Sequence, residues 1–395
     1  MMKKVGLALL AGAALITGTG WAIAQHGSPP PPKVSLAAHH DAIPFKLFRG
    51  NRVVAPARLN GRDTEVILDT GASITTVNRD YARSIGLPQG MKVSARGAGG
   101  DVEAEIVSGV TLEIGGTRFD EMTVAVMDLE PVARAIGHPM NVVLGREFFN
   151  SAVISIDWAS SQLRVTPQDR FTARQGSTAL GLKRRGPFNT IPVSIAGGQP
   201  VEALLDLGNG GALSVPESYW AKRADLAALP YAEGQLGGVG GLHASRSTTF
   251  PSVTLAGRTF NNVPGSLGSG GNDHEPAQMT NVGIGMLKQF VVDLDLGRNR
   301  IYLTPRTDSP AFDRDRVGAR MELLGDRLKV VFVSPTGPAA AGGLKVGDEI
   351  TAVDGRRVTP DFYAGSDWAR QPVGTSVALQ RADGRIATVT LRDYF

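Results

Sequence analysis

The stretch that decides the fold is Val66–Ser73, which reads VILDTGAS. Three apolar residues typical of a buried strand run directly into an acid, a hydroxyl and a glycine. Carboxylates are rarely buried without a partner, so an acid that ends an apolar strand requires an explanation. A second copy, ALLDLGNG, occupies residues 203–210. One isolated Asp-x-Gly is typical of an ordinary strand-end turn, so a functional interpretation depends on what surrounds both copies.

The two halves of the chain repeat the same order of features. In each half a glycine-containing turn precedes the acid-bearing strand. Further along the chain comes an apolar run that ends on glycine, and then a strand in which apolar and polar residues alternate. These features lie at Asn60–Gly61, Gly145 and 153–158 in the first half, and at Gly197–Gly198, Gly285 and 290–296 in the second. A shared order of this length indicates an internal duplication of a β-rich unit.

The two motifs can be compared with a known family. DTGAS after an apolar strand, with a later apolar-apolar-glycine, resembles the aspartic proteases of the retropepsin type, and two copies in one chain resemble the pepsin arrangement. The resemblance covers residues 45–305. It implies a mainly β fold with two lobes, residues 45–168 and 178–305, and a cleft between them where the two acid-bearing turns meet.

The candidate catalytic residues are Asp69 and Asp206. Two carboxyl groups held about 3 Å apart cannot both ionise cheaply, so they share one proton. The ionised member can take a proton from water while the protonated member polarises the scissile carbonyl, which hydrolyses a peptide bond without a covalent intermediate, metal or cofactor. The sequence leaves open which acid is the base, because the pair titrates jointly.

The neighbours of the acids have supporting roles. Gly71 and Gly208 let each backbone turn tightly. In the family that the chain resembles, a threonine hydroxyl bonds across to the turn of the opposite lobe. Thr70 matches that role, whereas Leu207 has no hydroxyl, so half of the reciprocal brace is missing. Gly145 and Gly285 are expected to support the site from the apolar runs that end on them.

The next position after each glycine bears on the pH dependence. Pepsin-type proteases often have a serine there that donates to the carboxylate and lowers its pKa. This chain has Ala72, with no donor, and Asn209, whose amide could donate. We therefore expect an optimum less acidic than that of pepsin, at about pH 5–6.5.

Glycine-rich segments in each half match the β-hairpin flap of the family. The first is Ala95–Asp101 and the second is Gly234–Gly241. Glycine gives such segments hinge freedom, although ordinary flexible loops are an equal alternative. The flap candidates are Gly97, Gly99, Gly100, Gly238 and Gly240.

The C-terminal region, residues 317–395, follows a polar linker at 306–316. From 330 to 355 a strand leads to a proline-started alanine helix, then to Gly-Asp and a second strand with an Asp-Gly turn. This pattern resembles a bacterial PDZ domain, which implies that peptide tails add a strand to a sheet edge. The implied carboxylate nest lies near Gly318, Ala319, Arg320 and Met321. A docking module that never grips a free tail is the alternative.

The first 24 residues are typical of a secretory signal. Lys3 and Lys4 give the positive end, Val5–Ile16 the apolar run, and Ala22–Ala24 the cleavage site. We expect cleavage after Ala24 and a periplasmic or secreted protein, with an uncleaved membrane anchor as the alternative. Residues 25–44 are proline-rich and predict an extended linker, in which His39 and His40 are solvated rather than metal-binding.

Composition narrows the remaining possibilities. The chain has no cysteine, so disulfides, thiol nucleophiles and thiolate metal sites are excluded. A net charge of +4 is too small to indicate nucleic acid as a partner. We expect no metal, no cofactor and a monomer. The first hypothesis is an exported aspartic endopeptidase whose PDZ domain recruits or gates polypeptide substrate. The alternatives are a catalytically silent, protease-like peptide-binding protein and a PDZ-mediated scaffold.

Overall fold

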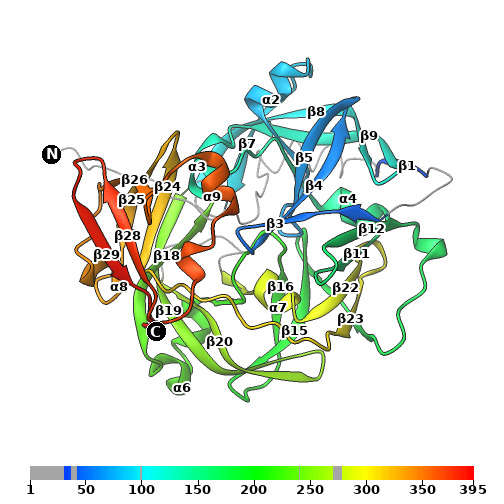
Figure 1. Cartoon of the computed structure of the whole chain (residues 1–395). Coiled ribbons are helices and arrows are strands. Elements are labelled where there is room, and N and C mark those ends of the chain that lie inside the picture. Colours follow the sequence, from blue (N-terminus) through cyan, green and yellow to red (C-terminus); the bar gives the residue numbers. More distant parts are fainter. Residues whose placement is uncertain (1–30, 37–41, 98–99, 240, 270–277) are drawn as a thin grey trace.

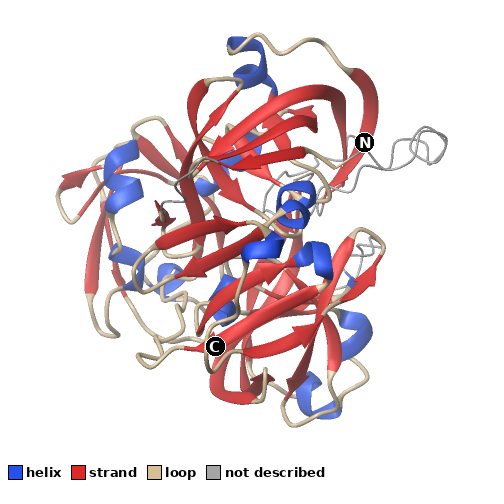
Figure 2. Cartoon of the chain, turned by 90° about the vertical axis from the view of Figure 1, so that its right-hand side faces the viewer, coloured by secondary structure: helices blue, strands red, loops and turns tan. Residues whose placement is uncertain are grey.

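The computed structural model describes residues 31–36, 42–97, 100–239, 241–269 and 278–395. The fold is mainly β, as the sequence predicts, and the described strands form four sheets (Figures 1 and 2). The predicted signal segment and the two adjacent histidines lie outside the described residues. Within the described residues, no helix has the length and apolar character needed to cross a membrane.

The first lobe is built on a nine-stranded sheet ordered β1-β9-β6-β10-β5-β4-β8-β7, with β3 paired to β4. Its strands are β1 (Lys33–Leu36), β3 (Lys46–Phe48), β4 (Arg52–Leu59), β5 (Arg62–Leu68), β6 (Thr76–Asn78), β7 (Met91–Gly97), β8 (Gly100–Ile114), β9 (Thr117–Met127) and β10 (Val142–Leu144). Its helices are α2 (Arg79–Ser84), α3 (Glu130–Ile136) and α4 (Arg146–Ser151). The last three residues of β5 are buried on both faces, because Val66 and Leu68 pack in one core cluster and Ile67 packs in another.

The second lobe repeats this plan in an eight-stranded sheet ordered β14-β15-β16-β21-β17-β20-β19-β18. Its strands are β14 (Lys183–Arg185), β15 (Phe188–Ile195), β16 (Val201–Leu205), β17 (Leu213–Val215), β18 (Tyr231–Gly238), β19 (Gly241–Leu255), β20 (Arg258–Gly268) and β21 (Thr280–Val282). Its helices are α5 (Glu217–Trp220), α6 (Ala224–Ala227) and α7 (Ile284–Leu287). In both lobes the acid-bearing strand runs parallel to a later short strand, β5 to β10 and β16 to β21, as a duplication requires.

A six-stranded sheet joins the lobes in the order β13-β23-β22-β11-β12-β2. The strands are β2 (Ile43–Pro44), β11 (Val153–Asp157), β12 (Gln162–Thr166), β13 (Thr178–Gly181), β22 (Phe290–Asp295) and β23 (Arg300–Pro305), with short 3-10 turns at Gln168–Arg170 and Leu296–Arg298. The antiparallel pair β11–β22 crosses from one lobe to the other, and one buried core runs through both. The N-terminal segment expected to be only a linker contributes β1 and β2, so part of it is ordered by strand pairing.

The C-terminal domain contains a sheet ordered β24-β25-β26-β28-β29, with β27 paired to β26. Its elements are β24 (Ala319–Leu324), β25 (Arg327–Val333), α8 (Pro338–Ala341), β26 (Glu349–Val353), β27 (Arg356–Arg357), α9 (Pro360–Gly365), a 3-10 turn at Trp368–Arg370, β28 (Ser376–Arg381) and β29 (Ile386–Thr390). Helix α9 begins after Thr359, whose hydroxyl accepts a hydrogen bond from Phe362 N at 3.0 Å. The linker at 306–316 has no helix or strand, but it is fixed to the second lobe by an ion pair between Lys288 and Asp313.

Candidate active site

The two predicted acids stand at equivalent points of the two lobes, directly after β5 and β16. Asp69 N donates to Leu144 O at 3.1 Å and Asp206 N donates to Val282 O at 3.0 Å, so each turn is fixed by the parallel neighbour of its strand. Both side chains are buried, with 5% and 1% exposure. The two carboxyl groups are hydrogen-bonded to each other. The structure therefore brings Asp69 and Asp206 together at the junction of the lobes.

The glycines after the acids permit this approach. A Cβ atom added to Gly71 would lie 2.7 Å from Asp206 Oδ1, and one added to Gly208 would lie 2.5 Å from Asp69 Oδ2. Each of these glycines therefore faces the carboxyl group of the opposite lobe. The close approach, rather than a positive φ angle, is what requires glycine here.

The two acids have different hydrogen-bond partners. Asp206 Oδ1 accepts from Gly208 N at 2.8 Å and Asn209 N at 3.1 Å, and its Oδ2 accepts from Asn281 Nδ2 at 2.7 Å. Asp69 Oδ1 accepts from Gly71 N at 2.8 Å. Donors favour the ionised form of a carboxyl group, so these bonds favour negative charge on Asp206.

The pKa of each acid follows from the same contacts. Burial, and next the negative charge of Asp206, raise the pKa of Asp69 to about 8. Burial also raises the pKa of Asp206, but the bond from Asn281 opposes this shift. The hydrogen bond between the acids raises the pKa of Asp69 and lowers that of Asp206. Together with the three donors to Asp206, these directions favour the shared proton on Asp69.

Thr70 makes the contact between lobes that its predicted role implies. Its Oγ1 donates to Leu205 O at 2.7 Å and accepts from Leu207 N at 2.9 Å. Leu207 is fully buried and packs in the core shared by both lobes. The brace is therefore made by one hydroxyl, and apolar packing takes the place of the second.

Removing this hydroxyl should destabilise the fold. Thr70→Val leaves Leu205 O and Leu207 N buried without their partner, and each unsatisfied group costs roughly 1–3 kcal/mol. We expect the free energy of unfolding to fall by about 2–6 kcal/mol in urea titrations. Thr117→Val is the matched control, because Thr117 is also buried but its Oγ1 has no partner among the described residues. Equal losses in the two variants would contradict the brace.

Asn209 and Asn281 form a relay that the sequence did not predict. The side-chain amide of Asn209 was expected to donate to the second acid. Instead, Asn209 Nδ2 donates to Asn281 Oδ1 at 2.8 Å, and Asn281 Nδ2 donates to Asp206. Asn281 lies in β21, beside the acid-bearing strand, so only strand pairing across the duplication could have identified it.

Gly145 and Gly285, which the sequence analysis paired as supporting glycines, do not occupy equivalent positions in the two lobes. Gly145 follows β10 and its N donates to Thr75 Oγ1 at 2.9 Å. In the second lobe β21 ends at Val282, so the counterpart of Gly145 is Gly283. Gly285 lies two residues further, inside α7, where an added Cβ would lie 2.8 Å from Ala212 Cα. The apolar run of the second half continues past the end of β21. For this reason the sequence analysis placed the supporting glycine at Gly285 rather than at Gly283.

Glu147 is a buried acid behind the first motif. It lies in α4, and its Oε1 accepts from Thr75 N at 2.6 Å. Ala72 is connected to the same helix, because its carbonyl oxygen accepts a hydrogen bond from Arg146 N at 3.0 Å. Burial raises the pKa of Glu147 to about 7.

The raised pKa values predict how stability depends on pH. Asp69 and Glu147 have pKa values of about 8 and about 7 in the folded chain, against ordinary values of 3.8 and 4.5. As the pH rises, the unfolded chain loses these protons at a lower pH than the folded chain does. The free energy of unfolding is therefore highest below about pH 4 and falls as the pH rises to about 8. We expect a lower Tm at pH 8 than at pH 5. Glu147→Gln should reduce the difference in Tm, and an unchanged difference would contradict the assignment.

The two predicted flaps correspond to β-hairpins in the described residues. Strands β7 and β8 pair up to Gly97 and Gly100, and β18 and β19 pair up to Gly238 and Gly241. Gly99 and Gly240 lie outside the described residues. The second hairpin, through residues 233–236, lines a cavity of about 380 Å³ that reaches the loop after Asp206. Whether either hairpin moves as a flap stays a prediction.

Arg52 is a cation near both acids that sequence reasoning missed. It begins β4, is 4% exposed, and its Nη1 donates to Asn51 O at 2.6 Å. Its positive charge lowers the pKa of both acids. A Cβ on Gly210 would collide with Nη1, so the guanidinium lies directly against the loop that follows Asp206. A lone arginine at the start of a strand gave no sequence signal of this position.

In the segment where the carboxylate nest of the C-terminal domain was predicted, two backbone amides bind an internal acid. Val317 N and Gly318 N donate to Asp315 Oδ1 at 2.8 and 3.1 Å, and Tyr394 Oη donates to Asp315 Oδ2 at 2.7 Å. Gly318 has a φ of +70°, and a Cβ there would lie 2.8 Å from Gly337 Cα. The following residues, Ala319, Arg320 and Met321, lie in β24, which contacts α3 of the first lobe.

No group of three potential ligands that could hold a metal ion occurs among the described histidines, aspartates and glutamates.

The comparisons with known proteins agree with the two architectures. Residues 55–148 match the family model for aspartyl proteases, a range that includes Asp69 and Gly145. Residues 316–382 match the family model for PDZ domains. No curated protein matches the chain. The chain therefore contains a retropepsin-like aspartyl protease domain and, at its C-terminal end, a PDZ domain.

Proposed function

We propose that the protein is an aspartic endopeptidase that hydrolyses peptide bonds between Asp69 and Asp206. The observation that carries the proposal is the direct hydrogen bond between these buried carboxyl groups, one from each lobe. A buried acid pair that keeps one proton at neutral pH is suited to general acid–base catalysis. The aspartyl protease match supports the chemistry for the first acid, and the duplication supports it for the second.

The hydrogen bonds assign a role to each acid. Asp206, which accepts three donors, is the carboxylate that takes a proton from a water molecule. The hydroxide equivalent adds to the scissile carbonyl carbon, while the proton on Asp69 is donated to the carbonyl oxygen. In the collapse, the proton held by Asp206 passes to the leaving nitrogen as the C–N bond breaks, and the oxygen-bound proton returns to Asp69. The pair is then ready for another cycle, and all atoms and charges balance.

The single-hydroxyl brace at Thr70 favours a second candidate. With Leu207 in place of a hydroxyl donor, the acid pair could be held well enough to bind a peptide but not to cleave it. Such a protein would be a catalytically silent peptide-binding protein or a scaffold that works through its PDZ domain. Binding without cleavage is the result that would identify it.

The test is digestion of a reduced, unfolded protein by the full-length chain between pH 4 and pH 8, with new N-termini identified by mass spectrometry. We expect internal cleavages that peak at about pH 5–6.5, because the pair must hold one proton. An Asp206→Asn preparation purified in the same way controls for contaminating proteases. Equal cleavage by both preparations, or none by either, would overturn the proposal.

Export and a monomeric state also belong to the proposal. The signal-like N-terminus supports export to the periplasm or the medium, and N-terminal sequencing of the mature protein should begin at Gln25. Two acids from one chain make a complete pair, so a monomer in light scattering should retain activity.

A further inference from the structure

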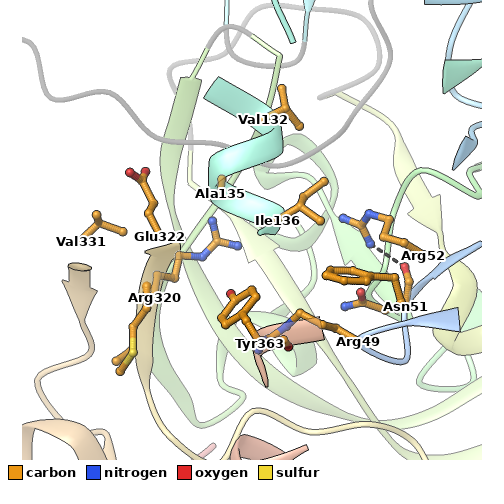
Figure 3. Close-up of a pocket in the computed structure, with 13 residues that line it drawn as sticks. Arg49, Asn51, Arg52, Val132, Ala135, Ile136, Arg320, Glu322, Val331 and Tyr363 are labelled. Carbon is orange, nitrogen blue, oxygen red and sulfur yellow. Dashed lines mark hydrogen bonds between the residues drawn. The ribbon is translucent and has the colours of Figure 1, made fainter. Parts of the chain in front are cut away.

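Arg52 is a buried cation of the first lobe that faces the second lobe. It begins β4 and lines a cavity of about 220 Å³ between the first lobe and the PDZ domain, where Figure 3 shows its bond to Asn51 O as a dashed line. Its Nε has no hydrogen-bond partner among the described residues. A guanidinium group stays protonated in proteins, so Arg52 keeps its positive charge although burial lowers its pKa. A buried charge of this kind requires an opposite charge nearby.

The opposite charge comes from the acid pair. The guanidinium of Arg52 lies against Gly210, and the carboxyl group of Asp69 lies against Gly208 in the same loop after Asp206. Both acids attract Arg52, and the charge of Arg52 in turn lowers the pKa of both acids. A pair of carboxyl groups that shares one proton carries a single negative charge. The acid pair and Arg52 together are therefore neutral.

Arg320 of β24 also acts on Arg52, as a second positive charge that lowers the pKa of Arg52. Arg320 lies near an acid of its own, because Asp315 attracts it. The acid pair is thus left to Arg52. The hydrogen-bond donors to the pair are uncharged amides, which belong to Gly71, Gly208, Asn209 and Asn281.

Hydrolysis moves the negative charge of the pair without changing its amount. Asp206 loses its charge when it takes a proton from water, and Asp69 gains a charge when it gives its proton to the carbonyl oxygen. The collapse step reverses both changes. Because Arg52 attracts both acids, it compensates the negative charge in either place. The proton transfers therefore never leave a buried charge without an opposite one.

We propose that Arg52 is the counter-ion of the acid pair and sets the pH range in which the pair holds one proton. The proposal rests on the proposed protease function and deepens it, because Arg52 acts through Asp69 and Asp206 as a positioning residue. A nearby positive charge favours the ionised form of a carboxyl group. Both proton losses of the pair therefore occur at a lower pH than they would without Arg52, which brings a deeply buried pair into a mildly acidic working range.

The first test compares the pH profile of cleavage for the unmodified protein, Arg52→Met and Arg52→Lys, with a reduced, unfolded protein as substrate. Cleavage requires one proton on the pair, so the rate rises and falls with the two proton losses. We expect Arg52→Met to move both limbs of the profile to higher pH by about 1 pH unit, which lowers the rate on the acidic limb by about 10-fold. Arg52→Lys keeps the charge, so its limbs should stay close to those of the unmodified protein.

Arg49→Met is the matched control for the pH profile. Arg49 lies in the turn before β4 and lines the same cavity, but its guanidinium stacks on Tyr363 of α9, 4.0 Å from the ring centre. The limbs of Arg49→Met should coincide with those of the unmodified protein. A loss of activity in Arg52→Met with unshifted limbs, or an equal shift in Arg49→Met, would overturn the counter-ion.

The second test does not depend on catalysis. Removal of Arg52 raises the pKa of both acids further above their values in the unfolded chain, so more stability is lost as the pH rises. We expect the Tm of Arg52→Met to lie at or above that of the unmodified protein at about pH 4, where protonated acids leave little charge to compensate. At pH 8 the Tm should be clearly lower, because the negative charge of the pair has lost its partner.

The two tests together separate the counter-ion from the protease. A larger fall in Tm from pH 4 to pH 8 in Arg52→Met, with no cleavage by the unmodified protein, would overturn the protease and keep the counter-ion. Cleavage by the unmodified protein, with the same limbs and the same fall in Tm in both proteins, would overturn the counter-ion and keep the protease. An Arg52→Met protein that is equally destabilised at both pH values would show a purely structural role for Arg52 and would also overturn the proposal.

Discussion

Asp69→Asn is expected to lower kcat for the digestion of unfolded polypeptide by about 100- to 10,000-fold, the range that general acid–base groups contribute. The structure assigns the shared proton to Asp69, and the asparagine amide can occupy the same volume. Its Nδ2 can donate to Asp206 as the protonated acid does, and its Oδ1 can accept from Gly71 N. The amide cannot give up a proton, so the chemical step should fail while the site keeps its shape.

Stability separates this effect from misfolding. Because the raised pKa of Asp69 lowers stability as the pH rises above the ordinary value of 3.8, the variant should have a Tm equal to that of the unmodified chain at about pH 4 and a higher Tm at pH 8. Retained digestion in a correctly folded variant would exclude the acid pair as the catalyst. Lost digestion together with a lower Tm at both pH values would point to a structural role for Asp69.

The sequence predicted the fold well because its strongest signals are local. Apolar strands ending in Asp-x-Gly turns, repeated in the same order, require two similar β units, and this order does not depend on distant contacts. The joining sheet was not predicted. Strand β2 is two residues long, and β11 and β22 come from different lobes, so no local sequence pattern marks their pairing.

The sequence predicted the site residues that lie within the two motifs, but not those that other parts of the chain contribute. Asp69, Asp206, Thr70, Gly71 and Gly208 lie within the two motifs. The fold places Asn281 beside the acids through strand pairing, Arg52 through the start of a strand, and Asp315 in its position through a turn. In the sequence, each of them resembles an ordinary polar surface residue. The apolar run that continues past Val282 also concealed Gly283, which shows that hydrophobicity alone does not mark the end of a strand.

Gly208→Ala is expected to abolish activity about as completely as removal of an acid, because the acid pair has no room for a methyl group. The added Cβ would lie 2.5 Å from Asp69 Oδ2, against the buried carboxyl group rather than a flexible side-chain end. The turns must therefore separate, which breaks the shared hydrogen bond and displaces reacting groups whose geometry tolerates little error. The pKa of Asp69 should move toward its ordinary value of 3.8 as the influence of Asp206 weakens.

Gly181→Ala is the control for this prediction, because Gly181 has open space around its Cβ position and no positive φ. It lies in β13 of the joining sheet, away from the acids, and should keep full activity. NMR titration of labelled aspartate would follow the pKa of Asp69 in both variants. An active Gly208→Ala protein would mean that the two turns can separate by the width of a methyl group without loss of function. In that case hydrolysis would not depend on a proton held between Asp69 and Asp206.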